Sequence, residues 1–84
     1  MTKAEKEVYN HVVATQEHCA LCGSMNESQL IMHHIRFGAG GRKTYIGNVI
    51  RLCTVCHIKV HKNDKKYRPI LIRKINEIEG IYED

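Results

Sequence analysis

Residues 48–61 of this 84-residue chain read NVIRLCTVCHIKVH, and this stretch decides how the rest of the sequence folds. It contains a CxxC pair, Cys53 and Cys56, and a second CxxC pair lies upstream at Cys19 and Cys22. A gap of two residues lets one tight turn present two thiolates to the same point, so two such turns supply the four donors of a tetrahedral zinc ion. The sequence therefore predicts a structural zinc held by four cysteines.

Four cysteines also permit two disulfides in a secreted protein, or free or redox-active thiols. Residues 1–28 contain no apolar run long enough for a signal peptide, and no segment approaches the length of a membrane span. We therefore expect a reducing, cytoplasmic setting and no membrane partner, and in that setting paired CxxC motifs usually bind metal. Free thiols explain two matched pairs poorly. A domain this short buries little apolar surface, so a metal that stabilises the fold is expected.

The charged residues are unevenly placed along the chain. Residues 1–28 carry two Lys against four Glu, residues 29–74 carry eleven Lys or Arg against Asp64, and residues 75–84 carry four acidic residues. The three segments therefore have net charges of −2, +10 and −4, and the whole chain has +4. A central segment this basic is typical of a protein that binds a polyphosphate, although a merely soluble basic surface produces the same pattern.

Apolar periodicity predicts one helix and two strands in the first part of the chain. Residues 2–15 contain no Gly or Pro and have apolar residues one turn apart, which indicates an amphipathic helix. Residues 30–35 and 48–52 have the composition of strands, and the segment between them, FGAGGRKTYIG, is rich in glycine. We interpret that segment as a loop.

The sequence predicts helical structure again after the second CxxC pair. No helix breaker occurs from Cys56 to about residue 67, and Pro69 is expected to end or redirect the helix near residue 68. Apolar residues at helical spacing then predict a last helix over about residues 70–79. The sequence shows no other internal division, so we expect residues 1–84 to form a single small α+β domain.

Four histidines form a second group whose spacing suits a metal site. His57 and His61 are four residues apart on the predicted helix and therefore share a face. His33 and His34 are neighbours on a predicted strand, so their side chains point to opposite sides. One of this pair can complete a three-histidine site while the other handles a proton. Metal-assisted phosphodiester cleavage needs such a cation, and it needs a base of near-neutral pKa to activate water.

These residues resemble the HNH endonuclease family, in the branch whose core carries two CxxC knuckles. The matching segments are CALC, MHHI, GNVIRLCTVCH and VH, which lie within about residues 19–61. The resemblance implies a ββα-metal (His-Me finger) core over about residues 19–66 with a four-cysteine zinc site, flanked by N-terminal and C-terminal helices. It also implies hydrolysis of DNA phosphodiester bonds, in the manner of the short stand-alone HNH nucleases of phages.

The resemblance further implies a role for each residue of the site. His34 is the general base that activates water. Asn48 either orients this base by hydrogen bonds across the hairpin or, as in some branches of the family, contacts the metal, and the histidines nine and thirteen residues after it favour the orienting role. The ligands of the catalytic metal are His33, His57 and His61, of which His61 is the more variable. The expected cofactors are therefore a structural Zn²⁺ and a catalytic divalent metal, either Mn²⁺, Ni²⁺, Mg²⁺ or Zn²⁺, and three imidazoles suit Mg²⁺ least.

Basic residues beside this group are candidate DNA contacts. Arg36, Arg42 and Lys43 flank the loop between the two strands, and Lys59 and Lys62 lie on the predicted helix that carries two of the histidines. Such side chains suit nonspecific contact with the phosphate backbone. A solvated basic surface is the alternative interpretation.

The residues leave more than one function open. The first is a metal-dependent endonuclease that nicks DNA or cuts both strands, and an RNA-directed nuclease is a variant of it. The other is a non-catalytic zinc-ribbon module that binds nucleic acid, which leaves the histidines and Asn48 unexplained. One small domain reads few bases, so we expect weak sequence preference. We expect a monomer or weak dimer in the cytoplasm of a bacterium or a phage-infected cell.

Overall fold

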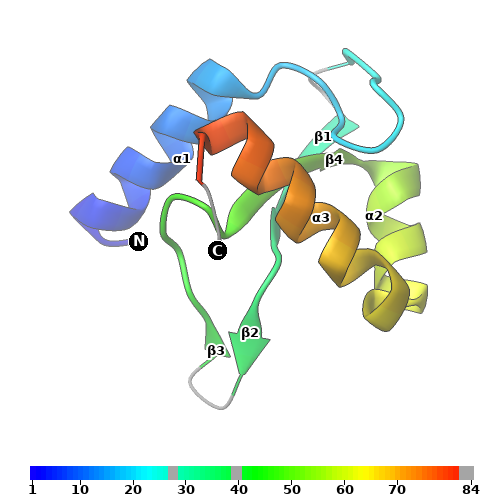
Figure 1. The fold of residues 1–84 in the computed structure, drawn as a ribbon. Coiled ribbons are helices and arrows are strands. Elements are labelled where there is room, and N and C mark those ends of the chain that lie inside the picture. The colour runs from blue at the N-terminus through cyan, green and yellow to red at the C-terminus, as the bar shows by residue number, and fades with distance from the viewer. Residues whose placement is uncertain (27–28, 39–40, 82–84) are drawn as a thin grey trace.

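The computed structural model describes residues 1–26, 29–38 and 41–81. Within these residues, three helices surround an antiparallel pair of strands, and a short hairpin projects from one end (Figure 1). In chain order the elements are α1 (Lys3–Thr15), β1 (Leu30–His34), β2 (Phe37–Gly38), β3 (Gly41–Arg42), β4 (Val49–Cys53), α2 (Thr54–Lys62) and α3 (Asp64–Glu79). None of the described helices is long and apolar enough to cross a membrane.

Strands β1 and β4 form the centre of the domain. They pair antiparallel, with Leu30 opposite Cys53 and His34 opposite Val49. All five residues of β4 are buried, because helices pack on both faces of the pair. The predicted small α+β fold is confirmed, with a four-cysteine cluster and with helices on both sides of the strand pair.

Part of the segment between β1 and β4, which the sequence predicted to be a loop, forms two short strands. Strands β2 and β3 pair within it, with Phe37 opposite Arg42, and the resulting hairpin extends away from the body (Figure 1). Only Ile35 and Arg36 separate β1 from the hairpin, whose two strands form a sheet of their own. Its residues therefore lie beside the end of β1 that carries the two histidines.

The prediction that Pro69 ends a helix is wrong. Helix α3 runs through Pro69, so it begins at Asp64 rather than near residue 70. The break falls instead at Asn63, whose φ of −149° and ψ of 62° end α2 and begin α3. A proline inside a helix removes one main-chain hydrogen bond. Burial of Leu71 and Ile75, which follow Pro69 in α3, offsets that loss.

The core joins the strand pair, the cysteines and the last two helices. Figure 1 shows α2 and α3 packed side by side, next to the strands. The buried cluster consists of Cys19, Ile35, Ile50, Leu52, Cys53, Cys56, Val60, Leu71 and Ile75. Three of the four cysteines belong to this cluster, so a metal bound there would be part of the core.

Helix α1 is fixed to the rest of the domain by polar contacts. The buried side chain of Gln16 accepts a hydrogen bond from the main-chain N–H of Arg51 (3.0 Å) and donates to the carbonyl of Val49 (3.3 Å). His11 lies 2.8 Å from both carboxylate oxygens of Glu79 near the end of α3. These contacts fix the position of α1 relative to β4 and α3.

Candidate metal centres and active site

The two CxxC turns meet at one point in the structure. The sulfur atoms of Cys19, Cys22, Cys53 and Cys56 all lie within 4.8 Å of one another. The Sγ atoms of Cys22 and Cys53 are 3.5 Å apart. A tetrahedral zinc with Zn–S bonds of about 2.3 Å separates its sulfur ligands by about 3.8 Å. The four thiols are therefore in position to bind a metal, and four cysteines are a donor set typical of structural zinc.

Both turns have the same local geometry. The N–H of Cys22 donates to Cys19 Sγ and the N–H of Cys56 donates to Cys53 Sγ, each at 3.5 Å. Cys53 is also the N-cap residue of α2, so its sulfur accepts one of the free N–H groups at the start of that helix. Gly23 follows the first turn with a φ of +79°, a conformation that side chains disfavour.

The protonation of the four thiols is strongly affected by their surroundings. Burial opposes ionisation of Cys19, but N–H groups of Cys22, Cys53 and Leu21 donate to its sulfur and lower its pKa to about 6. Burial and the neighbouring sulfurs raise the pKa of Cys56. Without a cation, the four thiols therefore resist full ionisation. A bound cation removes this restriction, which fits a metal site.

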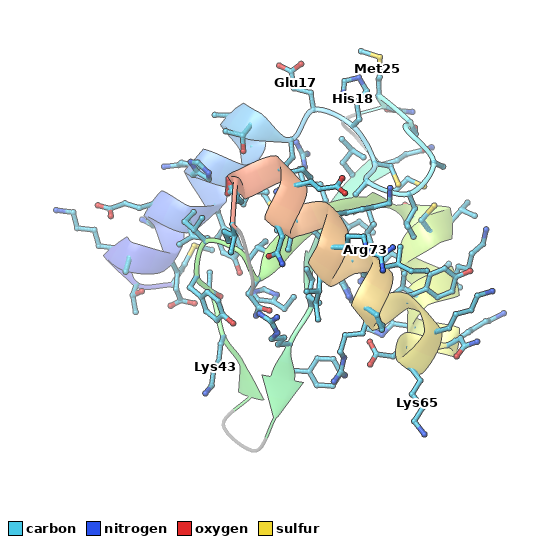
Figure 2. All side chains as sticks on the ribbon, in the orientation of Figure 1. Glu17, His18, Met25, Lys43, Lys65 and Arg73 are labelled. Atoms are coloured by element: carbon cyan, nitrogen blue, oxygen red, sulfur yellow. The ribbon has the colours of Figure 1, made fainter. Side chains whose placement is uncertain are left out.

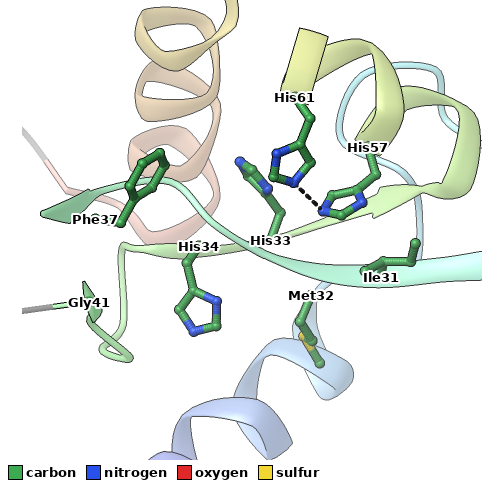
Figure 3. A pocket seen from close by; sticks show the side chains of 8 residues that line it. All are labelled: Ile31, Met32, His33, His34, Phe37, Gly41, His57 and His61. Carbon is green, nitrogen blue, oxygen red and sulfur yellow. Dashed lines mark hydrogen bonds between the residues drawn. The ribbon is translucent and has the colours of Figure 1, made fainter. Parts of the chain in front are cut away.

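Three histidines form the second cluster. His33 on β1 and the pair His57 and His61 on α2 have ring nitrogens within 4.8 Å of one another. The Nε2 atoms of His57 and His61 are 3.0 Å apart, and the ring centroid of His33 lies 5.4 Å from His57 and 5.5 Å from His61. Figure 3 shows the three rings converging between β1 and α2. The cluster forms because α2 begins directly after β4, the strand that pairs with β1.

The environment of His33 fits a cation. Its Nε2 is buried and has no hydrogen-bond partner among the residues that the structure describes. Burial, together with the neighbouring His57 and His61, lowers the pKa of His33 to about 4, so the ring is neutral at pH 7. A neutral imidazole has the lone pair that a metal requires. Leaving such a buried nitrogen unpaired is costly, and a metal ion would satisfy it.

His34 faces the other side of the strand, as the alternation of strand residues predicts. Its Nε2 lies 2.8 Å from Thr44 Oγ1 and 3.3 Å from the hydroxyl of Tyr9 on α1. Figure 3 shows its ring pointing away from the other three histidines. All four histidines line one cavity of about 480 Å³, together with Ile31, Met32, Phe37 and Gly41. The side of β1 that carries His33 thus faces the candidate metal site, and the opposite side carries the imidazole of His34.

Asn48 joins the two ends of the hairpin segment. Its fully buried side chain accepts a hydrogen bond from the N–H of Arg36 (2.7 Å) and donates to the carbonyls of Arg36 (3.0 Å) and Lys43 (2.6 Å). These partners are main-chain groups. Since Lys43 immediately precedes Thr44, the contacts of Asn48 hold in place the segment that touches His34.

Comparison with known families agrees with this geometry. The model of a family described as HNH endonuclease matches residues 19–63, just over half of the chain. The chain belongs to the HNH endonuclease family. No curated protein and no solved structure matches it. The HNH match covers both cysteine pairs, β1 to β4 and α2, and it supports a nuclease-type function that acts on nucleic acid. Helices α1 and α3 lie entirely outside the match.

In this HNH core, we expect the contacts of Asn48 to contribute strongly to stability. Asn48→Ala leaves three partly buried main-chain groups without their partners, so the free energy of unfolding should fall by about 3 kcal/mol. Urea denaturation of the metal-loaded protein measures this change. Asn63→Ala is the matched control, because the Asn63 side chain makes no capping hydrogen bond to α3. Equal losses in the two variants would contradict the prediction.

The predicted basic contacts of the HNH domain near the hairpin lie on its exposed surface. Arg36 and Lys43 are exposed and precede and follow the hairpin strands. Figure 2 shows the Lys43 side chain pointing away from the body of the molecule. Arg42 lies on β3, and its side chain is outside the described part of the chain. The hairpin thus carries exposed positive charge beside the histidine cavity.

The other two predicted contacts lie on α2. Lys59 and Lys62 are both exposed. Successive helix residues are rotated by about 100°, so Lys59 lies about 200° around α2 from His57. Lys59 is therefore on the side of the helix away from the histidine cavity, and Lys62 lies between the two sides.

Sequence reasoning missed three residues at this site of the HNH domain. Tyr9 and Thr44 contact His34, and Phe37 lies on the rim of the histidine cavity with half of its side chain exposed. The guanidinium of Arg68 lies 5.0 Å from the centre of the Phe37 ring. No spacing rule connects these residues to the histidines, because they come from other segments of the chain.

Proposed function

We propose that this chain is a metal-dependent endonuclease that hydrolyses phosphodiester bonds in DNA. The observation that carries the proposal is the buried His33, whose Nε2 has no hydrogen-bond partner among the described residues and whose ring lies beside those of His57 and His61. His34 lies next to this cluster in the same cavity. Membership of the HNH family supports a nuclease, and the basic central segment supports DNA as the substrate.

In the proposed mechanism, His33, His57 and His61 would hold the catalytic metal. A divalent cation bound there, either Mn²⁺, Ni²⁺, Mg²⁺ or Zn²⁺, would supply a Lewis acid that neutralises negative charge on the phosphate group. The cavity that these three imidazoles line has room for a phosphate group of DNA. Separately, the four cysteines hold a structural Zn²⁺ that takes no part in the reaction.

In the same mechanism, His34 acts as the general base. Water is a weak nucleophile, and an imidazole of near-neutral pKa accepts its proton as it attacks phosphorus. Arg36 and Lys43 contact the DNA backbone on either side of the hairpin and hold the phosphate beside the cavity. Asn48 keeps these two residues at a fixed separation through their main-chain groups.

A plasmid-cleavage assay tests the proposal. Wild-type protein should convert supercoiled plasmid to nicked or linear DNA in the presence of at least one of the four metals, and EDTA should stop the reaction. His57→Ala should lower the initial rate at least about 100-fold, because it removes a ligand of the metal that stabilises charge on the phosphate.

The matched control is His18→Ala, since His18 is exposed and does not line the histidine cavity; Figure 2 shows it on the connection that follows α1. Its cleavage rate should equal that of the wild type. If the wild-type protein binds plasmid but leaves it uncut with all four metals, the chain is a nucleic-acid-binding module and the proposal is wrong.

A further inference from the structure

Two hydroxyl groups from different parts of the chain hold the imidazole of His34. Thr44 lies after β3, and its Oγ1 is 2.8 Å from Nε2 of His34. Tyr9 lies on α1, and its hydroxyl is 3.3 Å from the same nitrogen. The Tyr9 ring also packs edge-on against His34, with centroids 6.1 Å apart and an angle of 85° between the planes. The HNH match covers residues 19–63, so it does not include Tyr9.

Both hydroxyl oxygens approach one ring nitrogen, which limits what that nitrogen can do. Neutral imidazole has one N–H and one nitrogen with a lone pair, and a hydroxyl oxygen can accept a hydrogen bond from the N–H. With two oxygens at 2.8 and 3.3 Å, Nε2 has little space for an attacking water. A hydroxyl can also donate to a ring nitrogen, so the two contacts occupy Nε2 whichever tautomer the ring adopts.

We propose that Tyr9 and Thr44 are positioning residues that hold the ring of His34 through its Nε2, in the orientation in which the ring receives a proton from water. This inference rests on the proposed function of His34 as the general base. In the step, a water O–H bond breaks and its proton goes to the His34 ring while its oxygen bonds to phosphorus. The P–O ester bond breaks, and the leaving oxygen keeps the electron pair and takes a proton from solvent.

The attachments of the two hydroxyl-bearing segments support a positioning role. Helix α1 is fixed by the hydrogen bonds of Gln16 to β4 and by the contact of His11 with α3. Thr44 directly follows Lys43, whose carbonyl accepts the 2.6 Å hydrogen bond from Asn48. The two hydroxyls are thus held independently on separate supports. Helix α1 thereby becomes part of the active site.

Variants that remove one hydroxyl at a time test this proposal. Thr44→Val and Tyr9→Phe delete the hydroxyl and keep the shape, and Thr44→Ser keeps the hydroxyl. We expect Thr44→Val to lower the single-turnover cleavage rate about 10- to 100-fold, the usual effect of losing a partner that orients a functional histidine. Tyr9→Phe should have a smaller effect because its contact is longer, and the double variant should be the slowest.

Three further results separate positioning from general damage to the fold. Thr44→Ser should restore most of the rate, the dissociation constant for DNA should stay within about twofold of wild type, and Tyr45→Phe should cut normally. Tyr45 is the neighbouring exposed residue, so it controls for loss of a phenol hydroxyl. A double variant that cuts at the wild-type rate would overturn the proposal, as would Thr44→Ser remaining as slow as Thr44→Val.

Nitrogen-15 NMR of the histidine rings gives a readout that needs no cleavage. In the zinc-loaded wild-type protein at neutral pH, the His34 ring should populate a single tautomer, and Thr44→Val should shift it toward a mixture of tautomers. A mixture of tautomers in the wild type would overturn the proposal. If the wild type shows a single tautomer but cuts no DNA, the proposed function fails, whereas positioning of the ring by Tyr9 and Thr44 is supported.

Discussion

Replacing His34 with alanine is expected to lower the rate of DNA cleavage by about 10²- to 10⁴-fold, the usual contribution of a general base. The ring lies in the histidine cavity beside the proposed metal site, and in the alanine variant water must lose its proton to solvent. The rate is measured as the initial nicking of supercoiled plasmid at pH 7 and saturating metal. Affinity for DNA should change little, because His34 is only 9 % exposed.

Loss of activity must be separated from loss of the fold, because His34 packs against Tyr9. His34→Gln fills a similar volume and can still hydrogen-bond with Thr44, but it cannot accept a proton, so it should be as inactive as the alanine variant. His18→Ala removes an exposed imidazole that does not line the cavity, and it should cut near the wild-type rate. Wild-type cleavage by both His34 variants would show that another group is the base.

The second large effect is expected from Cys53→Ser, which should unfold the domain. Cys53 is 6 % exposed, is one of the four clustered thiols and caps the start of α2. Apparent binding free energies of structural zinc are about 10–16 kcal/mol, whereas a small domain has a total stability of only about 5 kcal/mol or somewhat more. Loss of one ligand should therefore remove most of the helical circular dichroism at 25 °C.

Metal analysis provides the control for this prediction. Wild-type protein should retain about one tightly held zinc per chain after dialysis against a mild chelator, and His33→Ala should retain it too, because the cysteine site does not use His33. Cys53→Ser should retain almost none. If the serine variant keeps both its circular dichroism and its cooperative thermal transition, the cysteine site contributes little to the fold.

The two metal-binding groups could be predicted from sequence because short-range geometry defines them. Two residues between cysteines fit one turn, four residues between His57 and His61 fit one helix face, and strand alternation separates His33 from His34. The structure places each group within 4.8 Å. The boundary between α2 and α3 was harder to predict from the sequence, because a proline usually ends a helix. Here the chain turns at Asn63 instead, and tertiary packing stabilises the helix on both sides of Pro69.

The sequence by itself therefore determined which residues can bind metal and which side of the strand each histidine takes. Only the tertiary structure decided what surrounds His34. Tyr9 reaches the ring from 25 residues away in the chain, which depends on how α1 packs. The partners of Asn48 are main-chain groups, which every residue has, so no side-chain pattern in the sequence identifies them. Contacts of both kinds arise only when distant segments meet in the folded domain.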